Sequence, residues 1–128
     1  MKHCLKKSYT VIFLFLIIPL TALAKNNCDS ATSTTDIRAC LSKEYKVADK
    51  HLNKKYRLLY SMLPDKGKQL LKKAQNSWLT FRKNECEFTA YRYHGGTLSL
   101  VISDTCYVDL TKARTKVLAD HIDLYKNN

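Results

Sequence analysis

Cysteine is the residue type in this 128-residue sequence whose number and spacing say most about its chemistry. There are five cysteines, at positions 4, 28, 40, 86 and 106, and no two of them form a Cys-x-x-Cys motif. That spacing argues against a zinc site. Structural disulfides, free thiols and a metal site are the three alternatives for these residues, and the compartment in which the protein resides decides among them.

Residues 1–24 have the three-part pattern of a signal peptide. Three lysines precede an uninterrupted apolar run at residues 11–18, and Ala22-Leu23-Ala24 supplies the small residues that a signal peptidase accepts. The apolar run is shorter than the roughly 20 residues that span a membrane, so we expect cleavage after Ala24 rather than a retained anchor. Asn27 before Cys28 is not the small residue that lipidation requires. We therefore expect a periplasmic or secreted protein with no transmembrane segment after cleavage.

Cleavage would leave 104 residues and four cysteines in an oxidising compartment, where thiols pair. An antiparallel hairpin centred on Gly95-Gly96 places Cys86 beside Cys106, within disulfide reach. Pairing of Cys40 with Cys86 is less favoured, because the first turn would leave them almost a full helical turn apart. The sequence predicts the disulfides Cys86–Cys106 and Cys28–Cys40.

Three helices are predicted to position these cysteines. A polar tail, residues 25–35, precedes a capping box formed by Ser33 and Asp36. The chain has three glycines and two prolines, too few turn residues for a many-stranded fold, although residues 98–102 alone could pass as a short strand. We predict an all-α fold, a disulfide-stapled three-helix bundle of antiparallel helices, with one domain at residues 36–128.

Apolar residues recur every three or four positions in each predicted helix. Pro64 ends the first series, and Gly95-Gly96 separates the second, which extends to about Tyr93, from the third, which Thr97 is expected to cap. The first series is Ile37, Leu41, Tyr45, Ala48, Leu52, Tyr56, Leu59 and Leu63; the second is Leu71, Ala74, Trp78, Phe81, Glu85 and Phe88; the third is Leu98, Ile102, Cys106, Leu110, Arg114, Leu118 and Ile122.

Glu85 and Arg114 are the two charged members of these apolar series. The hairpin register places Arg114 opposite Trp78, with Glu85 about two turns away along the same face. The guanidinium could stack on the indole and pair with Glu85, which would make all three residues determinants of the fold. A ligand cleft built from the same side chains is the functional alternative.

Catalytic and cofactor motifs are absent from the sequence. His51, His94 and His121 stand on separate segments with no ligand partner at i+4, so no metal site is predicted. Asp49 and Asn53 share a helix face, but such a pair more often forms a hydrogen bond than a catalytic site. No nucleophile motif, P-loop or dinucleotide-binding turn is present. The sequence predicts a protein without enzymatic activity or cofactor.

The charge of the chain points to anionic partners. Its formal net charge is +11, or +8 after loss of the three leader lysines. A basic face along the first helix could attract lipopolysaccharide, another anionic envelope polymer or an acidic protein. No aromatic residues are interleaved with it, which makes nucleic acid an unlikely partner. The basic face consists of Lys43, Lys46, Lys50, Lys54 and Arg57.

Short motifs between the cysteines occur in a specific order: Ala-Asp-x-x-Leu-Asn, Ala-Gln-x-x-Trp-x-x-Phe-Arg, Gly-Gly-Thr and Thr-x-x-Arg. This combination resembles the lysozyme inhibitor LprI N-terminal domain family of small exported helical proteins, over essentially the whole chain after the leader. The resemblance implies inhibition of lysozyme or a related wall-cleaving enzyme and brings no catalytic residues. It also implies that Trp78, Arg82, Cys86 and Arg114 determine the fold.

The turn between the second and third helices is the candidate partner-binding site. Its residues, His94, Gly95, Gly96 and Thr97, would expose backbone, and the small side chains permit close approach by a partner. Binding of an anionic polymer by the basic face is the alternative function. A further alternative is an immunity-type partner of a periplasmic toxin, which the sequence does not separate from an enzyme inhibitor.

Overall fold

Three helices make up the protein in a computed structural model that describes residue 28 and residues 30–127. They are α1 (Thr34–Met62), α2 (Asp65–Tyr91) and α3 (Leu98–Lys126). The predicted all-α fold is confirmed, and residues 98–102 are the first turn of α3 rather than a strand. The predicted signal peptide lies outside the described residues. Within the described part of the chain, no helix has the length and apolar character needed to cross a membrane.

The helix ends follow from local sequence. The Ser33 hydroxyl oxygen accepts a hydrogen bond from the backbone N–H of Asp36 at 3.1 Å, which confirms the predicted cap of α1. Pro64 cannot continue α1 and instead stands immediately before α2, a position that suits its fixed φ. Thr97 precedes α3 but makes no side-chain capping bond, because its own backbone is helical (φ −66°, ψ −20°). The prediction that Thr97 caps α3 is therefore wrong.

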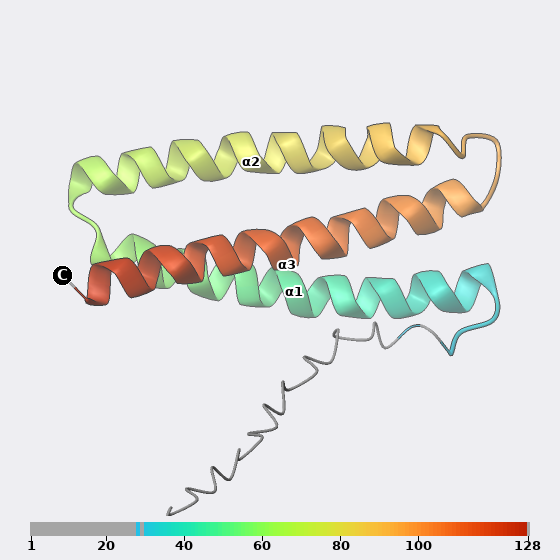
Figure 1. Ribbon diagram of the computed structural model, residues 1–128, viewed down its shortest axis with the longest axis horizontal. Helices are drawn as coiled ribbons and strands as arrows, with labels where there is room; N and C mark the ends of the chain where they lie inside the picture. The colour runs from blue at the N-terminus through green and yellow to red at the C-terminus, as the bar shows by residue number, and fades with distance from the viewer. Residues whose placement is uncertain (1–27, 29, 128) are drawn as a thin grey trace, which may run out of the picture.

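Helix α3 is the central element of the fold (Figure 1). It packs against α1 along its length and less extensively against α2, whereas α1 and α2 make little contact with each other. Two apolar clusters join α1 to α3. One lies near the first turn and the C-terminal end of α3, where Leu71 and Trp78 of α2 also pack against it; its buried members are Leu52, Leu59, Leu63, Leu118 and Ile122. The other contains Cys28, Leu41 and Val108.

Both predicted disulfides are present. Cys28 is bonded to Cys40, and Cys86 to Cys106, with Cα–Cα distances of 5.7 and 5.5 Å. The first bond ties the segment before α1 to its second turn. The second joins α2 to α3 near the turn that connects them. The N-terminal end of α1 lies at the same end of the bundle, so both bonds are located there.

The face that α2 turns toward α3 differs in part from the predicted one. Its buried residues are Gln75, Arg82 and Cys86, whereas Phe81 and Phe88 of the predicted apolar series are exposed. The difference is a rotation of α2 about its own axis. Because Cys86 is bonded to Cys106 and fully buried, residues four and eleven positions before it must share its face. The covalent bond overrides the apolar periodicity of this helix.

Candidate functional site

The turn between α2 and α3, the predicted partner-binding site, is accessible to solvent. His94, Gly95, Gly96 and Thr97 are all exposed. Gly95 has φ +85°, in the left-handed region that disfavours other residues. A Cβ atom on Gly96 would meet only the Tyr93 carbonyl oxygen, at 3.9 Å, so a larger side chain could be accommodated there. The turn therefore presents unobstructed backbone to a partner.

The His94 side chain is held against the end of α2. Its ring stacks on that of Tyr91, with 5.0 Å between centroids and 12° between planes. Its Nδ1 lies 2.9 Å from the Tyr91 carbonyl oxygen. Since a carbonyl oxygen only accepts hydrogen bonds, Nδ1 carries the proton and Nε2 is the ring nitrogen left for a partner.

The five residues of the basic face are all exposed on α1. None of them forms an ion pair with any described residue: the ion pairs found there involve other cations, Arg38, Lys68, Lys83 and Lys112. The positive charge of this face is thus not neutralised by neighbouring carboxylates. It can attract anions in a salt-dependent manner.

Arg82 is buried among aromatic rings at the centre of the molecule. Only 8% of the residue is exposed, and its guanidinium carbon lies 4.9, 5.3 and 5.5 Å from the ring centroids of Trp78, Tyr107 and Tyr45. One terminal nitrogen donates to the Thr111 hydroxyl at 2.8 Å, whereas the buried Nε has no partner among the described residues. All three helices contribute a ring to this cage, so Arg82 contacts them through cation–π geometry, without an ion pair among the described residues.

Arg114 occupies the neighbouring position on α3. Its guanidinium lies 5.9 Å from the Trp78 ring, and its Nε donates to the Gln75 side-chain oxygen at 3.1 Å. Burial lowers the pKa of Arg114, because desolvation disfavours the charged form. Glu85 is half-buried and forms no ion pair with Arg114 in the described structure. The expected pairing is therefore replaced by a hydrogen bond to Gln75.

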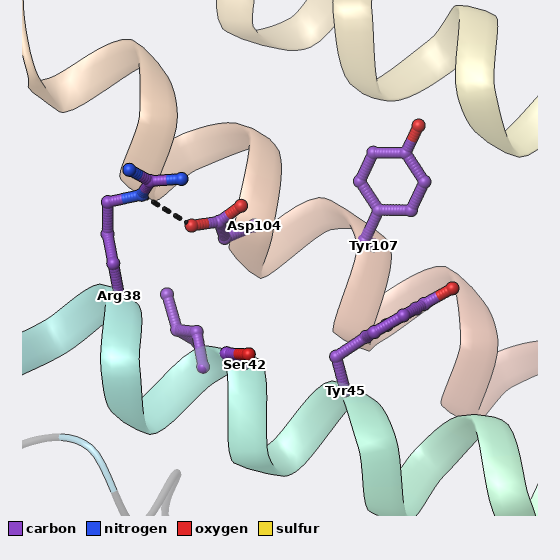
Figure 2. Close-up of a pocket in the computed structure, with 6 residues that line it drawn as sticks. Arg38, Ser42, Tyr45, Asp104 and Tyr107 are labelled. Carbon is purple, nitrogen blue, oxygen red and sulfur yellow. Dashed lines mark hydrogen bonds and ion pairs between the residues drawn. The ribbon is translucent and has the colours of Figure 1, made fainter.

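A groove of about 330 Å³ lies between α1 and α3 (Figure 2). Arg38 and Asp104 form an ion pair across it, with Nε and Oδ2 2.8 Å apart. The Tyr45 and Tyr107 rings meet edge to face at 6.0 Å. Because the cation and the carboxylate neutralise each other, the groove offers both hydrogen-bond donors and acceptors without a net charge. The sequence analysis did not identify it, since it depends on how α1 and α3 face each other.

Potential metal ligands come together at one place in the described structure, where Cys28, Cys40 and Glu44 have ligand atoms within 4.8 Å of one another. Both sulfurs belong to a disulfide and cannot act as thiolates. The Glu44 carboxylate lies 2.9 Å from the Lys112 ammonium group.

Asp49 accepts a hydrogen bond from the Asn53 amide at 2.8 Å, the interaction expected of this pair. The arrangement suits structural roles for all of these residues.

Comparison with known proteins gives the family. The sequence profile of the lysozyme inhibitor LprI family matches residues 24–118, about three quarters of the chain. The protein belongs to the lysozyme inhibitor LprI family. It is 30% identical to the uncharacterized protein R02472 of Rhizobium meliloti (strain 1021), with 79% of this chain and 82% of the relative covered. It is also 30% identical to the uncharacterized protein YecT of Escherichia coli (strain K12), with 81% and 71% covered. No solved structure matches it significantly.

Family motif residues converge in the structure. Trp78, Arg82 and Arg114 meet around one indole ring, and Cys86 is bonded one helical turn beyond Arg82. Gln75, Tyr107 and Thr111 complete this region but were not singled out individually by their chemistry. Thr111 could have been found from the hairpin register. That register places Arg82 opposite the middle of α3, where Thr111 lies. That Trp78, Arg82, Glu85 and Arg114 determine the fold remains a prediction.

Proposed function

We propose that this LprI family member is an exported binding protein that inhibits a lysozyme or a related wall-cleaving enzyme. The observation that carries the proposal is family membership across residues 24–118. Two disulfides support export, since they persist in oxidising compartments. The absence of a recognisable catalytic motif in the sequence supports action by binding rather than catalysis.

The contact surface in this proposal is the turn at residues 94–97. A glycoside hydrolase cleaves its substrate in a cleft that carries two carboxyl groups, and a protruding turn can occlude such a cleft. Gly96 leaves the backbone approachable, and His94 offers a ring nitrogen at the same point. Occlusion requires neither a cofactor nor a metal.

The test is lysis of cell-wall fragments by chicken-type, goose-type and invertebrate-type lysozymes, followed by turbidity, with and without the oxidised chain from residue 25 to residue 128. We expect inhibition of at least one type that persists at high salt. The persistence follows because the chain is strongly basic, so salt would weaken only repulsion between it and a basic enzyme. Failure to inhibit any of the three types at either salt concentration would contradict the proposal.

The Gly96→Trp variant tests the contact surface. Gly96 does not have a positive φ and has open space around its Cβ position, so the variant should keep the helical circular dichroism of the parent while losing inhibition. Gln69→Trp, at an exposed position in the first turns of α2, is the matched control and should inhibit normally. Full potency of Gly96→Trp would show that the turn is not the contact surface.

The basic face supports a second candidate function, binding of an anionic envelope polymer. Its five exposed cations lack ion-pair partners in the described structure. Replacement of Lys46, Lys50 and Lys54 by Glu should abolish binding to lipopolysaccharide vesicles, which should also weaken as salt rises. The control changes the same charge elsewhere, at Lys83, Lys116 and Lys126. Binding that is insensitive to salt, or equal in both triple variants, would contradict this function.

A further inference from the structure

The groove between α1 and α3 has the size and lining of a small-molecule site (Figure 2). Its volume of about 330 Å³ lies at the lower end of the range for such sites, about 300 to 1,000 Å³. The polar side chains of Arg38, Ser42 and Asp104 line one end, and the rings of Tyr45 and Tyr107 line the other. Such a lining suits a small ligand that has both an apolar face and polar groups.

The ion pair in the groove leaves most of its hydrogen-bonding capacity unused. Arg38 donates to Asp104 through Nε alone, and Oδ2 is the carboxylate oxygen that accepts. The terminal nitrogens of Arg38 and Oδ1 of Asp104 form no hydrogen bond with another described residue. Both side chains remain partly exposed, at 42% and 32%. Guanidinium N–H donors and a carboxylate acceptor are therefore available side by side to a ligand.

The charges around the groove favour a neutral ligand. An anion bound to Arg38 would lie against the carboxylate of Asp104, and a cation bound to Asp104 would lie against Arg38. A cation would also be repelled by Arg82, whose guanidinium lies behind the two tyrosine rings, 5.3 and 5.5 Å from their centroids. The other ion pair that joins α1 to α3 in the described structure, Glu44 with Lys112, is closed at 2.9 Å. No residue of the basic face lines the groove, so a ligand of either sign meets repulsion that a neutral ligand avoids.

A sugar ring combines the properties that the groove requires. Each hydroxyl group both donates and accepts hydrogen bonds, so adjacent hydroxyls can bind a guanidinium N–H and a carboxylate oxygen together. The C–H faces of the ring are apolar and pack well against aromatic side chains. The Tyr45 and Tyr107 rings, which meet edge to face with 6.0 Å between centroids, supply such a surface next to the ion pair.

We propose that the groove between α1 and α3 binds a neutral pyranose sugar, with its hydroxyl groups on Arg38 and Asp104 and a C–H face on the tyrosine rings. This site does not include the turn at residues 94–97 or the basic face. The proposal therefore stands or fails separately from inhibition of a wall-cleaving enzyme.

Nuclear magnetic resonance titration of the oxidised, ¹⁵N-labelled chain from residue 25 to residue 128 tests the proposal. The ligands are the neutral trimers of N-acetylglucosamine and of glucose, with the zwitterion diglycine for comparison. At least one trimer should shift the amide resonances of residues 38–45 and 104–107 in a saturable manner at millimolar concentration, whereas diglycine should not. Absence of shifts with both trimers, or shifts at these residues with diglycine, would overturn the assignment of a neutral sugar.

Ser42→Trp tests the location of the site. Ser42 is exposed on α1 and lines the groove, so a tryptophan there should fill the groove and abolish the shifts caused by the sugar. Val47→Trp is the matched control, because Val47 is 57% exposed on the same helix and lies outside the groove. The control should bind the sugar as the parent does, and both variants should keep the helical circular dichroism. Normal binding by Ser42→Trp, or saturable shifts confined to another surface, would overturn the location.

Asp104→Asn tests the role of the ion pair. The variant keeps the size of the side chain but removes the carboxylate, so sugar binding should weaken at least about ten-fold. Asp109→Asn makes the same change at an exposed position of α3 outside the groove and should leave binding unchanged. Equal binding by the two variants would overturn the contact between the sugar and the ion pair.

Discussion

The two interfaces of α3 are built from different kinds of contact. Against α1, it buries apolar side chains in two clusters, one toward each end, and two ion pairs, Arg38–Asp104 and Glu44–Lys112, flank them. Against α2, beyond the cluster near the first turn, the contacts include a disulfide, the contacts of Arg82 with Tyr107 and Thr111, and a hydrogen bond between Gln75 and Arg114. The α1–α3 interface resembles a conventional core, whereas the α2–α3 interface is directional and partly covalent.

This difference explains why α2 has exposed aromatic residues. Apolar burial is non-directional and would favour turning Phe81 and Phe88 inward. A disulfide and a caged guanidinium permit only one rotation of the helix, and that rotation places both phenylalanines in solvent. Stability at the α2–α3 interface and exposure of these phenylalanines therefore have the same structural cause.

Leu118→Ala should have the largest effect on stability, because Leu118 is fully buried at the centre of an apolar cluster. We expect a loss of about 4 kcal/mol in the free energy of unfolding, from lost burial and the cavity left behind. Urea unfolding measures it, with Val117→Ala at the exposed neighbouring position as the control. A loss equal to that of the control would show that the α1–α3 interface is not the main source of stability.

Loss of the Cys86–Cys106 disulfide should affect α2 selectively. The bond closes a loop with a sequence separation of 20 residues, so the Cys86→Ala, Cys106→Ala double variant should lose about 3 kcal/mol. Amide hydrogen exchange should rise most in the second half of α2, while α1 and the second half of α3 keep their protection. Equally faster hydrogen exchange in all three helices would mean that α2 does not depend on this disulfide more than α1 does.

Arg82→Ala should lower the free energy of unfolding by about 2 kcal/mol, because three rings lose their cation and a cavity remains. Arg82→Met keeps much of the volume without the charge. Its thermal or denaturant unfolding therefore separates the contribution of packing from that of the cation. We expect the Met variant to be less destabilised than the Ala variant but still less stable than the parent. A Met variant as stable as the parent would show that packing alone, and not the cation, joins the three helices here.

Gly95→Ala should have the smallest effect, a loss of about 1 kcal/mol, because Gly95 has φ +85° and alanine disfavours that conformation. Gly96→Ala is the matched control, since Gly96 does not have a positive φ and has free space around it, and it should leave the free energy of unfolding nearly unchanged. Thermal unfolding of both variants checks the difference. Equal effects would contradict the conformational argument for the α2–α3 turn.

Much of the fold was predictable because it depends on local sequence. The apolar series of α1 is confirmed from Leu41 to Leu63, since α1 has one partner and one buried face. The Cys86–Cys106 disulfide followed from the register about the second turn, and Cys28–Cys40 was the pair that remained. For α2 the same periodicity argument was right for Leu71 and Trp78, which pack against the cluster near the first turn, and wrong for Phe81 and Phe88, because it ranked them by hydrophobicity and gave no weight to the direction that Cys86 must face.

The sequence by itself determined the helices, the cap at Ser33, the break at Pro64 and the cysteine pairs, since each depends on neighbours along the chain or on a simple hairpin register. Only the tertiary structure decided the rotation of α2, the aromatic surroundings of Arg82 and the groove beside Arg38 and Asp104. Those features depend on which of several competing contacts a helix satisfies when it packs. In this protein, one covalent bond and one buried guanidinium accompany a helix rotation that leaves Phe81 and Phe88 of α2 exposed.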